Sequence, residues 1–271
     1  MTYLLYLGVG GVVGFFSGLL GLAGGVFIVP ALLFIFSIQG IPPGIAMQLA
    51  VATSLACVLV TSPASIYTHH QKNTIRWDLL RKLLPSVVLG ALLGGALAIV
   101  TDGNLLQLLF GIFQLCIGAQ LLVGRFSVER SSQPSTGILR LAGGILGILS
   151  ALLGIASSLT TSFLVFSGVP MRNAIATATA VGFLIALFST MVYATVNRAA
   201  DFTVANTLGY IYLPALLGIA LSSIPAARFG SLLSQQVSHQ VLRKAFGFIL
   251  LVLGCRFVWL HMTQYLSFIG Y

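Results

Sequence analysis

The residues of this chain that are best placed to do chemistry lie in a glycine-rich motif that occurs twice. The first copy occupies Gly14–Gly25 and reads GFFSGLLGLAGG, and the second occupies Gly147–Ser158 and reads GILSALLGIASS, 133 positions later. Glycine-interrupted apolar segments at matching positions of two halves are typical of a transporter's binding site. Lipid offers no partner to an unpaired backbone group, so a broken helix is tolerated only where protein or a water-filled cavity receives it. The two breaks therefore predict two half-helix ends that face one shared site.

Small or hydroxyl-bearing residues follow each break. A helix N-terminus offers free N–H donors and a partial positive charge, and hydroxyl groups add donors without a charge to desolvate. We therefore expect an anion-binding site at the breaks, although small residues also let membrane helices pack closely. The candidate residues here are Gly21, Gly24, Gly25, Gly154, Ser157, Ser158 and Thr160.

A second set of polar residues follows a Pro-containing turn in each half. Gln48 precedes the hydroxyls of Thr53 and Ser54, and Asn173 precedes that of Thr177. Their amide and hydroxyl groups can line the same site, or they can make ordinary hydrogen bonds between helices. The sequence favours neither interpretation.

Carboxylates and catalytic sets are missing from the apolar stretches. The acidic residues are Asp78, Asp102, Glu129 and Asp201, and all lie in or beside predicted loops. A proton relay through carboxylates within the membrane is therefore disfavoured. There is no nucleotide-binding loop, metal-ligand set or Ser/His/Asp set with a credible base. We predict no enzyme activity, no catalytic residue, no metal and no cofactor.

The composition indicates a polytopic membrane protein. Of 271 residues, 58% are hydrophobic and 6% are charged, whereas a soluble domain has about 25% charged residues. The net charge of +9 does not indicate nucleic acid, because the basic residues lie mostly in short connections. There they set topology and contact anionic lipid, and they would also favour an anionic solute.

The elements that position the motifs are helices of about 20 apolar residues. Residues 3–38 and 138–167 are each predicted as a broken or re-entrant helix pair. Single spans are predicted at 45–68, 83–100, 105–124, 171–196, 207–227 and 241–267. The expected fold is an all-α polytopic membrane protein with about eight transmembrane helices in two homologous repeats. The repeats are predicted at 1–124 and 138–271, joined by a linker at 125–137.

Two further matches support this duplication. Ala52-Thr53-Ser54 corresponds to Ala176-Thr177-Ala178 at an offset of 124, and Phe110-Gly111 corresponds to Phe246-Gly247 at an offset of 136. The fall in offset from 133 to 124 places about nine additional residues in the first half, around Gln39 to Gly44. The sequence leaves parallel and inverted repeats open. With eight spans, the distribution of Lys and Arg among the loops predicts cytoplasmic N- and C-termini.

The doubled glycine motif resembles that of the sulfite exporter TauE/SafE family, also called the toluene sulfonate uptake permease superfamily. Pro30, ATSL at 52–55 and VPMRNAIAT at 169–177 extend the resemblance over essentially the whole chain. It implies a duplicated four-helix bundle in the inner membrane that moves sulfur-containing oxyanions. By this resemblance, the family motifs fall on Gly21, Gly24, Gly25, Ala52, Thr53, Ser54, Gly154, Ala176 and Thr177. The chain departs from the family pattern at Ser157-Ser158, where Gly-Gly is frequent, and at Gln48, where His is common.

Together these features predict a permease for small anions, such as sulfite, thiosulfate or sulfoacetate, with alternating access around a mid-membrane site. The expected partners are the anionic substrate and the lipid bilayer of the inner (plasma) membrane, without nucleic acid; a homo-oligomer is left open. Two other functions also remain open: a channel or carrier for a neutral solute, and a non-transporting membrane assembly partner.

Overall fold

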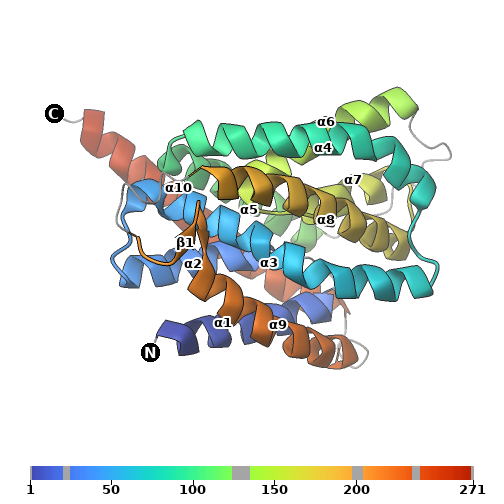
Figure 1. Cartoon of the computed structure of the whole chain (residues 1–271), viewed down its shortest axis with the longest axis horizontal. Coiled ribbons are helices and arrows are strands. Elements are labelled where there is room, and N and C mark those ends of the chain that lie inside the picture. The colour runs from blue at the N-terminus through green and yellow to red at the C-terminus, as the bar shows by residue number, and fades with distance from the viewer. Residues whose placement is uncertain (1, 21–24, 124–134, 197–203, 234–238, 270–271) are drawn as a thin grey trace.

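The computed structural model describes residues 2–20, 25–123, 135–196, 204–233 and 239–269, which form a bundle of helices (Figure 1). Within these residues, α3, α4, α5, α6 and α8 are long and apolar enough to cross a membrane. The chain is therefore a polytopic helical membrane protein. The elements are α1 (Thr2–Leu20), α2 (Gly25–Ile38), α3 (Pro43–Gln71), α4 (Trp77–Val100), α5 (Gly103–Val123), α6 (Thr136–Leu153), α7 (Ser158–Phe166), α8 (Met171–Thr195), β1 (Thr207–Leu208), β2 (Ile211–Tyr212), α9 (Leu213–Leu233) and α10 (His239–Ile269).

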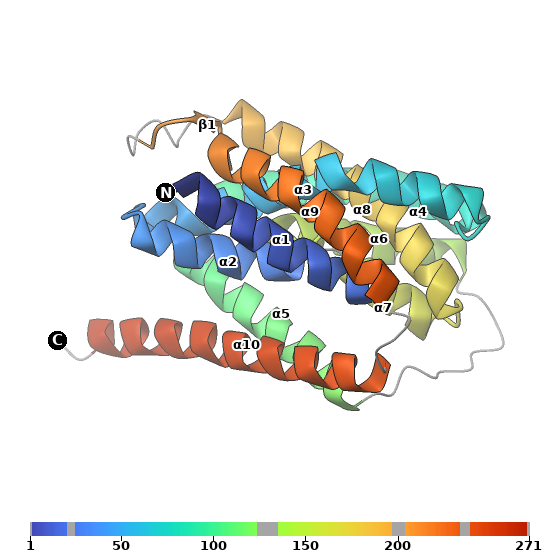
Figure 2. The same cartoon turned by 90° about the horizontal axis from the view of Figure 1, so that it is seen from below.

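The first helix of each half is interrupted at the predicted position. Helix α1 ends at Leu20, α2 begins at Gly25, and the Tyr6 hydroxyl donates to Gln39 Oε1 at 2.9 Å. This bond joins the start of α1 to the end of α2, so the two helices form a hairpin (Figure 2). Helix α6 ends at Leu153 and the short α7 begins at Ser158. The expectation of broken or re-entrant helices is confirmed in this respect.

Close helix pairs hold the bundle together. The most extensive contacts are α1 with α9, α4 with α6, and α5 with α10. A Cβ added to Gly118 would lie 2.9 Å from Gly247 O, and one added to Gly254 would lie 2.9 Å from Gly111 O. Because Gly111 faces Gly254 while Gly118 faces Gly247, α5 and α10 run antiparallel.

Helices α3 and α8 form the centre of the bundle. In the 18-residue apolar window of α3, 78% of the residues are buried inside the bundle, the largest share among the five membrane-length helices. The Asn173 amide at the start of α8 donates to the Thr74 carbonyl just after α3, so these two helices also run antiparallel.

The segment predicted as a helix at 207–227 begins differently. Thr207–Leu208 and Ile211–Tyr212 form a two-stranded antiparallel ribbon, and α9 starts only at Leu213. Gly209 has φ +57° at the tip, where an added Cβ would collide with the end of α8 at Tyr193. Tyr210 N–H donates to Tyr193 O at 3.0 Å, which ties the ribbon to that helix.

Two further boundaries differ from the predicted ones. Helix α4 starts at Trp77 rather than at residue 83, and α6 starts at Thr136, inside the expected linker at 125–137. The Ser135 hydroxyl accepts from Ile138 N–H and so caps α6.

Candidate functional site

The break of the second half starts where Gly154 ends α6. Gly154 has φ +70°, a left-handed conformation that glycine adopts without strain and that ends helices. Ile155 and Ala156 follow and are fully buried. A side chain at Gly154 would also press on Val51 Cα, 3.1 Å from the added Cβ. The glycine is therefore required both for its backbone angle and for the close approach of α3.

Helix α7 begins directly after the break without a side-chain cap. The Ser157 carbonyl accepts the first helical bond, from Thr161 N–H at 2.9 Å, but the Ser157 side chain makes no capping bond. The first-turn N–H groups of a helix have no partner within the helix. The N-terminus of α7 is buried, since Ser157 and Ser158 are 5% and 4% exposed. Its donors and its partial positive charge thus face the protein interior.

Three hydroxyls around this break have no hydrogen-bond partner among the described residues. Ser150 Oγ, Ser158 Oγ and Thr160 Oγ1 are buried and make no hydrogen bond within the described part of the chain. A buried polar group without a partner costs about 1–3 kcal/mol. A bound group with several acceptor oxygens could accept hydrogen bonds from the uncapped amides of α7 and from these hydroxyls.

The break of the first half lies against the second. A Cβ added to Gly25, the first residue of α2, would lie 2.6 Å from Gly154 O and 3.4 Å from Ser54 Oγ. The Ser54 hydroxyl donates to the same Gly154 carbonyl at 3.1 Å. The structure therefore brings together Gly25, Ser54 and Gly154, beside Ser157 and Ser158. Gly21 and Gly24 lie outside the described residues.

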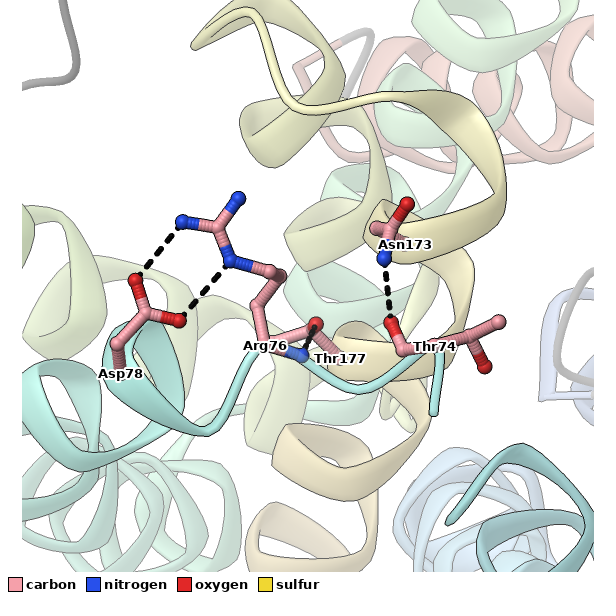
Figure 3. A network of polar contacts seen from close by, with 5 residues as sticks. All are labelled: Thr74, Arg76, Asp78, Asn173 and Thr177. Carbon is pink, nitrogen blue, oxygen red and sulfur yellow. Dashed lines mark hydrogen bonds and ion pairs between the residues drawn. The ribbon is translucent and has the colours of Figure 1, made fainter. Parts of the chain in front are cut away.

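The other predicted site residues make hydrogen bonds to connecting segments. Thr177 Oγ1 accepts from Arg76 N–H at 2.9 Å, and the Asn173 amide donates to Thr74 O at 2.9 Å (Figure 3). Thr53 Oγ1 accepts from the backbone N–H of Tyr212 at 3.0 Å. These bonds use polar atoms of both α3 and α8.

Gln48 reaches the end of α4 in a similar way. Its Nε2 donates to Thr101 O at 2.9 Å, while its Oε1 is buried and has no partner among the described residues. Gln48, Thr53, Asn173 and Thr177 thus each make a hydrogen bond to the backbone of a connecting segment. That these residues line the solute site stays a prediction.

An ion pair lies beside the Thr177 contact. Arg76 Nε donates to Asp78 Oδ1 at 3.0 Å, and Arg76 Nη2 donates to Asp78 Oδ2 at 2.9 Å (Figure 3). The hydrogen bonds that Arg76 donates to Asp78 raise the pKa of Arg76 above its usual range. Both side chains are at least a third exposed, so the pair adds little stability.

Two amide side chains of α5, which the sequence analysis did not single out, also contact the helices beside the breaks. Gln114 is fully buried, and its Nε2 donates to Val26 O in the first turn of α2 at 3.3 Å. Gln120 Oε1 accepts from the Ser162 hydroxyl of α7 at 3.5 Å. Gln114 Oε1 and Gln120 Nε2 have no partner among the described residues. The signal in the sequence was the presence of amides inside a predicted apolar span, where polar side chains are costly.

The described residues contain no cluster of three His, Cys, Asp or Glu side chains that could hold a metal. Among them, Cys57 is buried, and Cys116 and Cys255 are exposed.

Comparisons with known proteins agree with this architecture. The sulfite exporter TauE/SafE family matches residues 6–257. A "probable membrane transporter protein" of Haemophilus influenzae is 28% identical over 253 residues, covering 93% of this chain and 96% of the relative. One of Methanocaldococcus jannaschii is 30% identical over 250 residues, covering 91% of each chain. No solved structure matches the chain.

Proposed function

Because the chain belongs to the sulfite exporter TauE/SafE family, we propose that it is a membrane permease for small anions, with sulfur-containing oxyanions or organosulfonates as its substrate class. The family and its relatives are membrane transporters and not enzymes, and so is this chain. The observation that carries the choice of an anion is the buried, uncapped N-terminus of α7 with the hydroxyls of Ser158 and Thr160, which lack partners among the described residues.

The charges of the bundle favour an anion over a cation. Among the described residues the acidic side chains are Asp78 and Asp102, and both are exposed at bundle ends. No described carboxylate therefore repels an anion at the breaks. Amide N–H and hydroxyl groups would hold an oxyanion without a fixed charge, and a weakly held ion can be released.

The two halves are, in this proposal, inverted repeats. Residues related by the sequence offsets of 133 and 136 make the same contacts in the two halves. Gly10 packs on Ile219 and Ser222, and the equivalent Gly143 packs on Leu83 and Ser86. The Thr53–Tyr212 bond corresponds in the same way to the Thr177–Arg76 bond. Since the equivalent helices α3 and α8 run antiparallel, the repeats would be inverted. This arrangement suits alternating access, in which one half rocks against the other around the paired breaks.

The distribution of basic residues suggests the orientation in the membrane. We define the basic end of the bundle as the end that holds the 72–76 connection and the starts of α6, α8 and α10. All Lys and Arg residues of the described segments except Arg256 lie at this end: Lys72, Arg76, Arg81, Lys82, Arg140, Arg172, Arg228, Arg243 and Lys244. The start of α1 and the end of α10 lie at the opposite end (Figures 1 and 2).

By the positive-inside rule, the basic end faces the cytoplasm and both chain termini face away from it. This reverses the expectation of cytoplasmic termini. That expectation placed the loops at 168–172 and 228–244 opposite the loop at 69–82. In the structure, the 72–76 connection, the start of α8, the end of α9 and the start of α10 lie at one end.

Cysteine labelling tests this orientation. In a background without the three native cysteines, Asn104→Cys should react with a membrane-impermeant maleimide in intact cells. Gln71→Cys, at the basic end, should react only after permeabilisation. Both positions are exposed in the structure. The reverse pattern would restore cytoplasmic termini and overturn this orientation.

Uptake into proteoliposomes tests the transport function. Purified protein should give saturable uptake of radiolabelled sulfite or thiosulfate over protein-free vesicles, and each anion should compete with the other. Folded protein that takes up neither would contradict the proposal. Flux of a neutral solute that oxyanions fail to inhibit would favour a neutral-solute carrier instead.

A further inference from the structure

Half-helix α2 contains a proline that leaves a gap in its hydrogen bonding. Pro30 has no backbone N–H, so it cannot donate to the carbonyl of Val26 four residues earlier. Val26 is 3% exposed and lies in the apolar core, away from water. An unpaired carbonyl at such a place is costly.

A side chain from another helix supplies the missing donor. Gln114 of α5 is fully buried, and its Nε2 donates to Val26 O at 3.3 Å. The opposite amide orientation would set two acceptor oxygens against each other, so the donor must face the carbonyl. The bond acts on the first turn of α2, one residue from Gly25, which closes on Gly154.

The second half provides a comparison within the same chain. Helices α2 and α7 start 133 positions apart, at Gly25 and Ser158, and the same offset takes Pro30 to Phe163. The glycines that pair α5 with α10 are 136 positions apart, and this offset takes Gln114 to Leu250. The proline and the amide are thus present together in one half and absent together from the other. This pattern is expected if the amide supplies the hydrogen-bond donor that the proline lacks.

We propose that Gln114 is a positioning residue that replaces the hydrogen bond removed by Pro30 and so fixes the first break against the second. The bond holds the first turn of α2 where Gly25 meets Gly154 and Ser54. The amide acts through α2 and needs no contact with the solute. The inference rests on the proposed function only in that the breaks line the solute path.

A double-mutant cycle tests this inference with two readouts. The variants are Gln114→Met, Pro30→Ala and their combination, with Gln107→Met on the same helix as the matched control. Hydrogen exchange of the peptide covering residues 25–38 reports the first turn of α2 without any solute. Sulfite uptake by proteoliposomes reports KM and Vmax separately.

Gln114→Met should speed exchange in this peptide and raise KM about fivefold, the factor for one net hydrogen bond of about 1 kcal/mol. Vmax should change less, since the amount of folded protein is unaffected. In the Pro30→Ala background, the alanine supplies its own N–H to the Val26 carbonyl, so Gln114→Met should alter neither readout. Gln107→Met should resemble the wild type.

Equal effects of Gln114→Met in both backgrounds, or no effect in the wild type, would overturn the inference. If the wild type takes up no sulfite, the proposed function fails, and the exchange measurements alone still decide whether Gln114 holds α2.

Discussion

Gly25→Ala is expected to reduce transport at least about tenfold while the protein still folds. The added Cβ would lie 2.6 Å from Gly154 O, a backbone atom that Ser54 also holds, so α2 and the second break must move apart. Overpacking of this kind costs about 1–3 kcal/mol. Because the contact joins the two half-helix ends, the displacement would fall on the site itself. The measurement is the initial rate of sulfite uptake per folded protein.

Gly11→Ala is the matched control for this substitution. Gly11 lies in α1, and no atom of the described residues lies within 4 Å of its added Cβ. Replacing an unconstrained helix glycine by alanine should leave uptake unchanged and raise the melting temperature slightly. Wild-type uptake by Gly25→Ala would contradict the idea that the paired breaks form the transport site.

The breaks themselves were predictable from sequence because glycine has a specific local effect. Gly154 adopts φ +70° and ends α6 where the motif indicated. The paired offset also predicted that the first break would meet the second, and the contact of Gly25 with Gly154 agrees. Local backbone preference and the repeated spacing were sufficient for this part of the site.

The direction of the helices could not be predicted in the same way. Hydropathy gives the length of an apolar stretch. It does not distinguish one helix that spans the membrane from two half-helices that return to the same side. Tyr6 bonded to Gln39 shows that α1 and α2 return, which changes the side assigned to every later loop. The Asn173–Thr74 bond brings the turn after α7 to the 72–76 connection, so α6 and α7 return as well. The prediction that the loops at 69–82 and 168–172 lie on opposite sides is therefore wrong.

The additional residues of the first half also lie elsewhere than expected. They were predicted around Gln39 to Gly44, but the turn at 39–42 is no longer than the turn at 167–170. Instead α2 has 14 residues against 9 in α7, and α3 has 29 against 25 in α8. An alignment of small apolar residues cannot distinguish a longer loop from an extra helical turn.

The polar side chains were found by type, but their partners depend on tertiary packing. Thr53 and Ser54 are neighbours in sequence, yet Thr53 bonds to the β2 backbone and Ser54 to the second break. Successive residues of a helix point in different directions, so adjacent hydroxyls serve different helices. Only the packed bundle separates the two roles.

Replacing Ser158 by Ala together with Thr160 by Val should weaken solute binding while leaving the fold as stable or more stable. Both hydroxyls are buried without a hydrogen-bond partner among the described residues. Removing such groups relieves a desolvation cost in the protein without solute. If they donate to the bound anion, each lost bond to a charged group is worth about 1.5–3 kcal/mol. The KM for sulfite should then rise at least about tenfold, with an unchanged or higher melting temperature.

Weaker solute binding together with unchanged or higher stability distinguishes a binding role of these hydroxyls from a packing role. Thr161→Val is the control, because the Thr161 hydroxyl donates to Ser157 O within the helix at 3.0 Å and is not free for a solute. Its KM should stay within about twofold of the wild type, since no donor to the anion is lost. If the double variant keeps its KM while its stability rises, the hydroxyls do not contact the solute and the anion must be held elsewhere. If both variants raise KM equally, the effect comes from packing of α7 rather than from the two free donors. Only a selective rise in the double variant places the anion at the uncapped end of this helix.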